Sequence, residues 1–271
     1  MFATLLIVFR EAFEAGLVIS VILSACKGIN IKWQVLTGIT LGILFACLLA
    51  VFTNSIENLL SGRGLEVFNA SLLSLTAVML IWQITWMSTH GRELAEKSSN
   101  QAIDIIKNKS NHFSIAIIVM VAVMREGSEV VMFLYSIMVS TGTGIQSIII
   151  GGLLGIVLGV IVSWITYKGL VLISIRKIFL YSNILLSLIA AGLVSQATGL
   201  LASIDLLPAL GYNIWDTSKL LSDNGWFGNI MRAIFGYTST PMGIQLLSWG
   251  VTLFVIISLT KIFKRAATHA H

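Results

Sequence analysis

Two copies of one short charged motif stand inside apolar segments of this chain. Both copies read Arg-Glu-x-x-Glu, and their charged residues are Arg10, Glu11, Glu14, Arg125, Glu126 and Glu129. On an α-helix, residues three and four positions apart share a face, so each arginine can pair with the glutamate four residues further on. The two glutamates of each motif also project from the same side. If the two helices meet, four carboxylates and two guanidiniums converge with a net charge of −2.

This set of side chains predicts a binding site for a hard metal cation. Carboxylate oxygens suit iron, manganese, magnesium and calcium, and a divalent ion would neutralise the net charge of the cluster. The four histidines lie outside the apolar segments, which argues against a zinc or copper site. Carboxylates alone do not separate the hard cations from one another. The same residues also allow a second interpretation, in which they form structural ion pairs in a membrane subunit that transports nothing.

The composition indicates that membrane-spanning helices hold these motifs. The chain has 271 residues, of which 56% are hydrophobic and 11% charged, with a mean hydropathy of +0.93. Soluble domains carry roughly 25% charged residues, so this chain lacks the polar side chains to cover a water-facing surface. Its two cysteines lie in apolar runs and argue against a disulfide framework or a Cys-rich metal site. We therefore expect an integral membrane protein that is not an enzyme and holds no cofactor.

Seven apolar segments are long enough to cross a bilayer, which takes about 20 residues. They are residues 2–26, 34–54, 69–88, 114–139, 145–167, 178–202 and 242–261. We expect only two long polar loops, 89–113 and 203–241, and both are too short for a separate soluble domain. The predicted fold class is therefore an all-α integral membrane protein with seven transmembrane helices, which form a single domain over residues 1–271.

The basic residues predict how the chain lies in the membrane. Twelve of the 17 Lys and Arg residues fall in loops on one side, three fall on the other, and Arg10 and Arg125 lie inside spans. Because Lys and Arg concentrate in cytoplasmic loops, this bias predicts an N-terminus outside and a C-terminus inside. Topology thus explains the net charge of +5, and we expect the lipid bilayer and no nucleic acid as a partner.

The first three spans repeat in the next three. The charged motifs lie 115 residues apart, and residues 71–87 align with 184–200 at an offset of 113, with eight of 17 positions identical. Since each unit has an odd number of spans, the two copies must cross the membrane in opposite directions, with a site near the midplane between them. The predicted parts are the inverted repeats 1–88 and 114–202, an outer loop 203–241 and a seventh, added span 242–261.

Small and polar residues recur at matching positions of the repeat. Small residues mark every fourth position in the second and fifth spans, namely Gly38, Gly42, Ala46, Gly151, Gly155 and Gly159. Such stripes let helix backbones approach closely, so they predict packing faces. Gln83 and Gln196 correspond in the third and sixth spans. Each amide either bonds across helices, which contributes about 0.6 kcal/mol, or supplies a carbonyl oxygen to a passing ion.

Taken together, these residues resemble the oxidase-dependent iron transporter family, which includes the fungal high-affinity ferric permeases and the bacterial Efe-type ferrous permeases. The two Arg-Glu-x-x-Glu motifs resemble the paired signatures of that family, and the likeness covers essentially the whole chain in the same order. It continues through Trp86-Met87, Trp215-Asp216-Thr217-Ser218, Leu221-Ser222-Asp223, Phe235-Gly236-Tyr237, Pro241 and Gln245.

The resemblance implies a multi-pass permease for high-affinity iron uptake across the cytoplasmic (inner) membrane. The residues that it implies for iron binding are Glu11, Glu14, Glu126 and Glu129, with Arg10 and Arg125 as supporting ion pairs. It also implies a partner outside the membrane, either an oxidase or a periplasmic iron-delivery protein. A permease for another hard divalent cation, such as manganese, is the alternative within the same class.

Two aspartates of the predicted outer loop complete the candidate residues. Asp216 is expected to cap a short helix that begins near Thr217, a common use of aspartate. Asp216 and Asp223 are also candidates for capturing iron at the outer mouth. Gln83 and Gln196 are the corresponding pathway candidates within the membrane.

Overall fold

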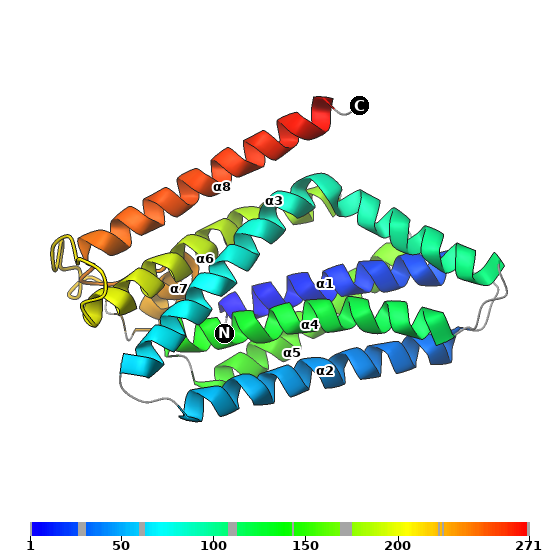
Figure 1. The fold of residues 1–271 in the computed structure, drawn as a ribbon, viewed down its shortest axis with the longest axis horizontal. Coiled ribbons are helices and arrows are strands. Elements are labelled where there is room, and N and C mark those ends of the chain that lie inside the picture. The colour runs from blue at the N-terminus through cyan, green and yellow to red at the C-terminus, as the bar shows by residue number, and fades with distance from the viewer. Residues whose placement is uncertain are drawn as a thin grey trace.

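The computed structural model is all-helical in the part of the chain that it describes (Figure 1). The described residues are 2–26, 31–59, 63–107, 113–142, 144–168, 175–221, 223 and 225–269. Within them there is no strand, and the eight helices are α1 (Phe2–Ala25), α2 (Lys32–Leu59), α3 (Arg63–Lys107), α4 (Phe113–Thr141), α5 (Ile145–Tyr167), α6 (Ile175–Ser203), α7 (Trp226–Phe235) and α8 (Gly243–His269).

Each predicted span falls within one long helix, to within one residue at its ends. The prediction was wrong for much of the polar segment 89–113, because α3 continues as a helix to Lys107. Polar residues there do not end the helix, since Glu, Lys, Ala and Leu all have high helix propensity and no proline intervenes. The segment 203–241 also contains the ten-residue helix α7, which the sequence pattern did not predict.

The apolar surface of the bundle suits a lipid environment. Among the described residues, five helices are long and apolar enough to cross a membrane, over Lys32–Phe52, Arg63–Trp86, Ile145–Tyr167, Phe179–Ser203 and Gly243–Phe263. The other two long helices, α1 and α4, each carry the three charges of one motif. On the outer faces, large apolar side chains such as Leu48, Phe52 and Phe254 are more than 60% exposed. Apolar surface of this extent is unfavourable in water and is typical of membrane contact.

The helices pack in pairs around α1 (Figure 1). α1 contacts α3, α4 and α5, while α2 packs against α4 on another side of the bundle. α3 packs against α6, and α6 in turn contacts α7 and α8. The two motif-bearing helices therefore touch each other and are covered by neighbours, which keeps the motif charges other than that of Arg125 away from the outer surface of the bundle.

The predicted glycine stripes are confirmed as packing faces. A Cβ on Gly38 of α2 would lie 2.6 Å from the Ala116 carbonyl oxygen of α4. A Cβ on Gly155 of α5 would lie 2.7 Å from the Leu5 carbonyl oxygen of α1. Because these helices approach through glycine, backbone lies against backbone, and dispersion contacts accumulate without help from the hydrophobic effect.

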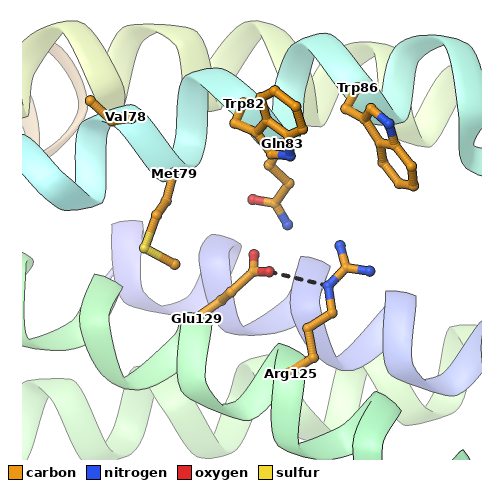
Figure 2. Close-up of a pocket in the computed structure, with 7 residues that line it drawn as sticks. All are labelled: Val78, Met79, Trp82, Gln83, Trp86, Arg125 and Glu129. Carbon is orange, nitrogen blue, oxygen red and sulfur yellow. Dashed lines mark ion pairs between the residues drawn. The ribbon is translucent and has the colours of Figure 1, made fainter.

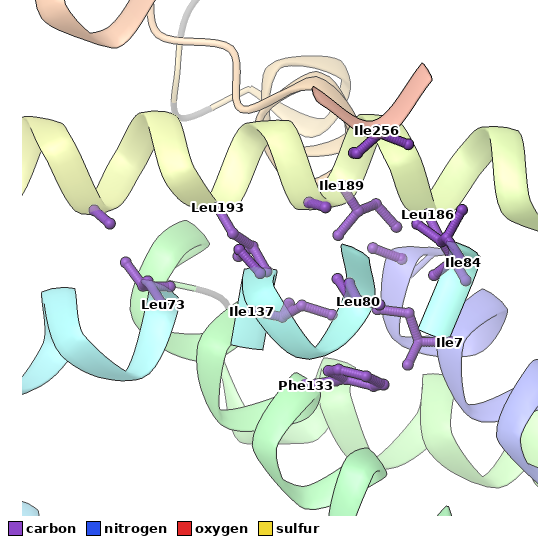
Figure 3. Packing of buried hydrophobic residues seen from close by; sticks show 14 residues of the cluster. Ile7, Leu73, Leu80, Ile84, Phe133, Ile137, Leu186, Ile189, Leu193 and Ile256 are labelled. Atoms are coloured by element: carbon purple, nitrogen blue, oxygen red, sulfur yellow. The ribbon is translucent and has the colours of Figure 1, made fainter. Parts of the chain in front are cut away.

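A hydrophobic cluster joins five helices next to the motifs (Figure 3). Its buried members come from α1, α3, α4, α6 and α8 and are Ala3, Ile7, Leu73, Ala77, Leu80, Ile84, Phe133, Ile137, Leu186, Ile189, Ala190, Leu193, Ala197 and Ile256. A second cluster joins α1, α2 and α4. The two clusters lie on either side of the motifs along α1 and α4, so both helices are packed against neighbours before and after their charged residues.

The segment after α6 folds back over one end of the bundle. α7 ends at Gly236, whose left-handed backbone (φ 68°) lets its N–H bond to the Arg232 carbonyl at 2.9 Å. Gly236 also lies directly against the backbone of Gly192 in α6, where a side chain would collide. The left-handed backbone and the close contact with Gly192 both favour glycine at this position, and the contact packs the end of α7 against α6.

The close approach of α5 to α1 yields a test of the fold. We expect Gly155→Ala to lower the melting temperature of the detergent-solubilised protein by several degrees, because overpacking costs about 1–3 kcal/mol. Gly152→Ala is the matched control, since a Cβ there meets nothing within 4 Å. Thermal unfolding followed by size-exclusion chromatography measures both. Equal melting temperatures for the two variants would contradict the described α1–α5 contact.

Candidate metal centre

Three motif carboxylates converge inside the bundle. One oxygen each of Glu11, Glu126 and Glu129 lies within 4.8 Å of the other two. Glu11 is 1% exposed and Glu126 is 7% exposed, so water screens their charges little. Residues three apart on α4 bring Glu126 and Glu129 to one face, and the α1–α4 contact brings Glu11 to them. A cluster of this kind offers the ligand type and spacing that a hard cation needs.

The fourth glutamate, Glu14, lies beside this cluster and pairs with Arg10. Glu14 Oε1 lies 2.9 Å from Arg10 Nε, and Glu11 Oε1 lies 3.7 Å from Arg10 Nη1. Arg10 is 2% exposed, so its charge is fully enclosed by the bundle. Glu14 is near enough to Glu126 and Glu129 to interact with them electrostatically, although it is not a member of the converging group.

The second motif is arranged in the same way but is more open. Arg125 Nε lies 3.5 Å from Glu129 Oε1 and 3.7 Å from Glu126 Oε1. The ion pairs that the spacing predicts within each motif are therefore both present. The two arginines differ in environment, however, because the Arg125 side chain is 43% exposed and that of Arg10 only 2%.

Gln83 of α3 joins the carboxylates as a hydrogen-bond donor. Its Nε2 donates to Glu11 Oε2 at 3.0 Å, and the residue is 3% exposed. The side-chain oxygen of Gln83 is buried and has no hydrogen-bond partner among the described residues. The sequence singled out this residue for its oxygen, whereas the structure also uses its amide nitrogen to hold Glu11. Gln196, its counterpart on α6, is partly buried, and no hydrogen bond joins it to the glutamates in the described part of the chain.

A pocket of about 260 Å³ leads to this group between α3 and α4 (Figure 2). Its lining residues are Val78, Met79, Trp82, Gln83, Trp86, Arg125 and Glu129. In Figure 2, Gln83 points from α3 toward Glu129, and Arg125 reaches up beside both. Sequence reasoning did not single out Met79 or Trp82 for this site. Met79 stands four residues before Gln83 and three before Trp82, and this helical spacing was the available signal.

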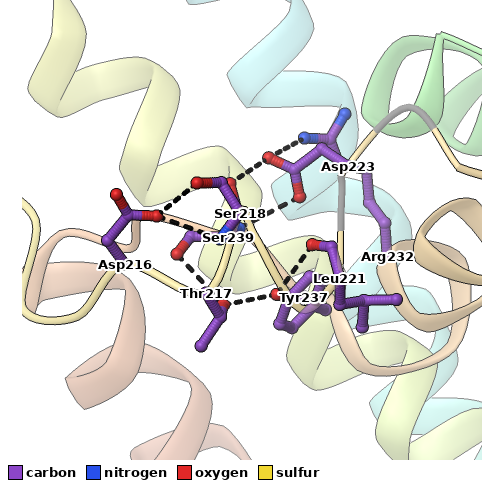
Figure 4. Close-up of polar contacts among 8 residues, drawn as sticks. All are labelled: Asp216, Thr217, Ser218, Leu221, Asp223, Arg232, Tyr237 and Ser239. Atoms are coloured by element: carbon purple, nitrogen blue, oxygen red, sulfur yellow. Dashed lines mark hydrogen bonds and ion pairs between the residues drawn. The ribbon is translucent and has the colours of Figure 1, made fainter.

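Two of the predicted pathway residues, Asp216 and Asp223, make hydrogen bonds within the segment 203–241 (Figure 4). Asp216 accepts bonds from the Ser218 amide at 2.9 Å and the Ser218 hydroxyl at 2.6 Å, which hold the pKa of this exposed carboxyl below its usual range. The prediction of a short helix beginning near Thr217 was wrong, because residues 218–220 form only a turn. An aspartate can cap a single turn as well as a helix, so the pattern did not separate the two.

Asp223 links distant parts of the same segment. Its carboxylate accepts bonds from the Ser239 amide at 3.0 Å and the Ser239 hydroxyl at 2.7 Å, and it pairs with Arg232 Nη2 at 3.4 Å. Tyr237 adds bonds to Thr217 and to the Leu221 carbonyl. Ser222, which belongs to the same sequence motif, lies outside the described residues.

This geometry defines a class: a multi-pass helical membrane protein with carboxylates gathered inside its bundle. The profile of the iron permease FTR1 family matches residues 1–267, and the chain belongs to this family of permeases, which is not an enzyme family. The sequence-based resemblance is thereby confirmed, and iron is the substrate class that the family supports.

Individual relatives agree with this assignment. The "Ferrous iron permease EfeU" of Escherichia coli O6:K15:H31 (strain 536) is 28% identical over 261 residues, which is 93% of this chain and 92% of the relative. The "Putative inactive ferrous iron permease EfeU" of Escherichia coli K12 has the same identity and coverage. The Shigella flexneri protein of the same name as the first is 27% identical over 205 residues, 75% of this chain and 86% of the relative. No solved structure matches the chain.

The bonds of Asp223 predict a measurable contribution to stability. We expect Asp223→Ala to destabilise the protein by about 1–3 kcal/mol, because it leaves the Ser239 donors and the Arg232 charge without their acceptor. Asp216→Ala, which removes a carboxylate bonded only to a neighbouring exposed turn, should leave the melting temperature close to that of the unmodified chain. Thermal unfolding in detergent tests the pair, and an unchanged melting temperature for Asp223→Ala would contradict its bridging role.

Proposed function

We propose that this chain carries iron inward across the cytoplasmic membrane through a site made by Glu11, Glu14, Glu126 and Glu129. The convergence of three of these carboxylates, within 4.8 Å of one another, is the observation that supports the proposal most. Buried carboxylates at this distance repel one another unless a cation lies among them. Acidic side chains inside membrane segments mark ion pathways by default.

The charges around the cluster favour a divalent ion. Arg10 pairs most closely with Glu14, and Arg125 with Glu129, so the two remaining carboxylates, Glu11 and Glu126, carry the net negative charge. A 2+ ion balances that charge, which agrees with the ferrous permeases among the relatives. An inside-negative potential of 100 mV would favour inward movement of such an ion by about 4.6 kcal/mol.

The helix pairing supports an inverted repeat with seven spans. If the first half maps onto the second, α1 corresponds to α4, α2 to α5 and α3 to α6. This exchange converts the α1–α5 pair into the α4–α2 pair, and both pairs occur in the fold. The third members of the two halves, α3 and α6, pack against each other. With the orientation that the basic residues favour, the N-terminus lies outside, the C-terminus inside and the site near the midplane.

Of the remaining candidate residues, Gln83 has the most direct place in the proposed pathway. Gln83 holds Glu11 in position and presents its own oxygen to the ion. The roles of Gln196, Asp216 and Asp223 in capturing or guiding iron stay predictions. In our proposal an oxidase or a periplasmic iron-delivery protein supplies the metal at the outer segment 203–241.

The glutamates of the site provide the direct test. In vesicles reconstituted with the purified protein, we expect Glu14→Gln and Glu129→Gln each to abolish nearly all uptake of radioactive iron, measured with and without ascorbate. The amide keeps the size of the side chain but removes the charge that holds the cation. Glu66→Gln, at the start of α3, is the matched control and should transport at close to the unmodified rate. Undiminished uptake by both site variants would leave the glutamates as structural ion pairs and overturn their role in transport. Uptake by the unmodified protein no faster than by empty vesicles would support the membrane subunit that transports nothing.

Competition between metals tests the identity of the ion. We expect unlabelled Fe(II) to suppress uptake of the radioactive iron fully, and Mn(II) at the same concentration to suppress it only in part. Mn(II) has the same charge and similar ligand preferences, so it is the most demanding competitor. If labelled manganese entered the vesicles while iron neither entered nor competed, the alternative permease function would replace the one proposed.

A further inference from the structure

A second polar layer lies two helical turns from the carboxylates on the same three helices. On α1, α3 and α4 in turn, Thr4, Thr76 and Ser136 stand seven residues from Glu11, Gln83 and Glu129. Seven residues rise about 10.5 Å and return to nearly the same helix face. Because α4 runs opposite to α1 and α3 (Figure 1), all three hydroxyl residues lie toward the same end of the bundle. We call Thr4, Thr76 and Ser136 the hydroxyl layer, and Glu11, Gln83 and Glu129 the carboxylate layer.

The three residues of the hydroxyl layer are buried, and only two of their hydroxyl groups have a hydrogen-bond partner among the described residues. Thr76 Oγ1 and Ser136 Oγ lie 2.7 Å apart across the α3–α4 contact, and the two residues are 0% and 1% exposed. Thr4 is 0% exposed, and its hydroxyl has no hydrogen-bond partner among the described residues. An unpartnered polar group in an apolar interior costs free energy, so a polar occupant at this level would be stabilised.

Between the two layers along each helix stands an apolar residue, and Figure 3 shows these three residues among the buried cluster. Ile7, Leu80 and Phe133, which we call the apolar layer, each stand three or four residues from a member of both polar layers on their own helix. They are 1%, 0% and 1% exposed and belong to one packed cluster. At the level of the apolar layer, α1, α3 and α4 therefore contribute only hydrocarbon side chains to the contact.

We propose that the hydroxyl layer is a second ion station on the outer half of the iron route, and that the apolar layer is the gate between it and the carboxylate layer. This inference rests on the proposed transport function and adds the path by which iron reaches the site. Neutral hydroxyl oxygens replace part of a hydration shell without trapping the ion by charge, and apolar constrictions close pathways by expelling water. The pocket beside Glu129 and Arg125 lies at the carboxylate layer and runs along α3 as far as Met79 and Val78, level with the apolar layer.

The competing explanation is that the hydroxyl pair only fastens α3 to α4, as polar pairs do in many membrane bundles. The chain offers a matched control for this explanation. Thr198 Oγ1 and Ser248 Oγ lie 2.9 Å apart across the α6–α8 contact, and neither helix carries an Arg-Glu-x-x-Glu motif. A purely fastening role predicts that loss of either pair has the same consequences.

Substitution of the hydroxyl tests the station. In reconstituted vesicles we expect Thr76→Val to lower the initial rate of iron uptake about tenfold, and Thr76→Ser, which keeps the hydroxyl, to stay within about twofold of the unmodified protein. Thr198→Val should also stay within about twofold, even if its melting temperature falls as far as that of Thr76→Val. Equal uptake by Thr76→Val and Thr198→Val would overturn the station.

Substitution in the apolar layer tests the gate. From vesicles loaded with Fe(II), we expect Phe133→Ser to leak iron down its gradient about tenfold faster, because the hydroxyl admits water to the layer. Phe133→Leu keeps the layer apolar and should leak at close to the unmodified rate. Leu80→Ser on α3 provides the same test if Phe133→Ser does not insert. Leak rates that do not differ between the Ser and Leu variants would overturn the gate.

The experiments separate the proposed transport of iron from the proposed outer route. If the unmodified protein did not accumulate iron, or if Glu129→Gln accumulated it normally, the proposed function itself would fail. If the unmodified protein and the glutamate variants behaved as expected while Thr76→Val and Phe133→Ser behaved like their controls, only the outer route would be wrong.

Discussion

The constraint that governs this structure is the placement of six charged side chains within helices of a bundle that faces lipid, and of the six only Arg125 is exposed. Each charge costs roughly 2.5–3.5 kcal/mol at the centre of a bilayer, so none can lie on the outer surface without a large penalty. The fold meets this demand by placing α1 and α4 against each other and covering them with α2, α3 and α5. The glycine contacts of α2 and α5 draw those covering helices to backbone distance.

The two copies of the motif share their internal ion pairs but differ in exposure. Arg10 is enclosed, whereas the Arg125 side chain is 43% exposed and borders the pocket. In an inverted repeat, two sequence-related halves have different surroundings whenever the molecule is open toward one side only. Arg125 and Glu129 form their ion pair in the wall of the pocket.

Polar groups of the segment 203–241 hold it in its folded shape. Asp223, Arg232 and Ser239 come from separate stretches and are joined by bonds that only a folded chain can make. Asp216 accepts a hydrogen bond from the amide of Ser218, only two residues away, and such a bond needs no long-range contact. Such loops resist prediction because aspartate and serine satisfy turns, helix ends and long-range contacts equally well. The sequence pattern therefore predicts a helix near Thr217, where the structure has a turn, and it does not predict α7.

Much of the architecture follows from the sequence alone, because it depends on period and composition. Apolar runs of about 20 residues place the long helices, the i, i+4 spacing pairs each arginine with its glutamate, and the glycine stripes mark the packing faces. Tertiary structure decided what depends on the meeting of helices. It made Glu11, rather than Glu14, the partner of Glu126 and Glu129, and it turned the amide of Gln83 toward Glu11. Periodicity specifies the face on which a residue lies, but the depth and rotation of neighbouring helices determine which atoms touch.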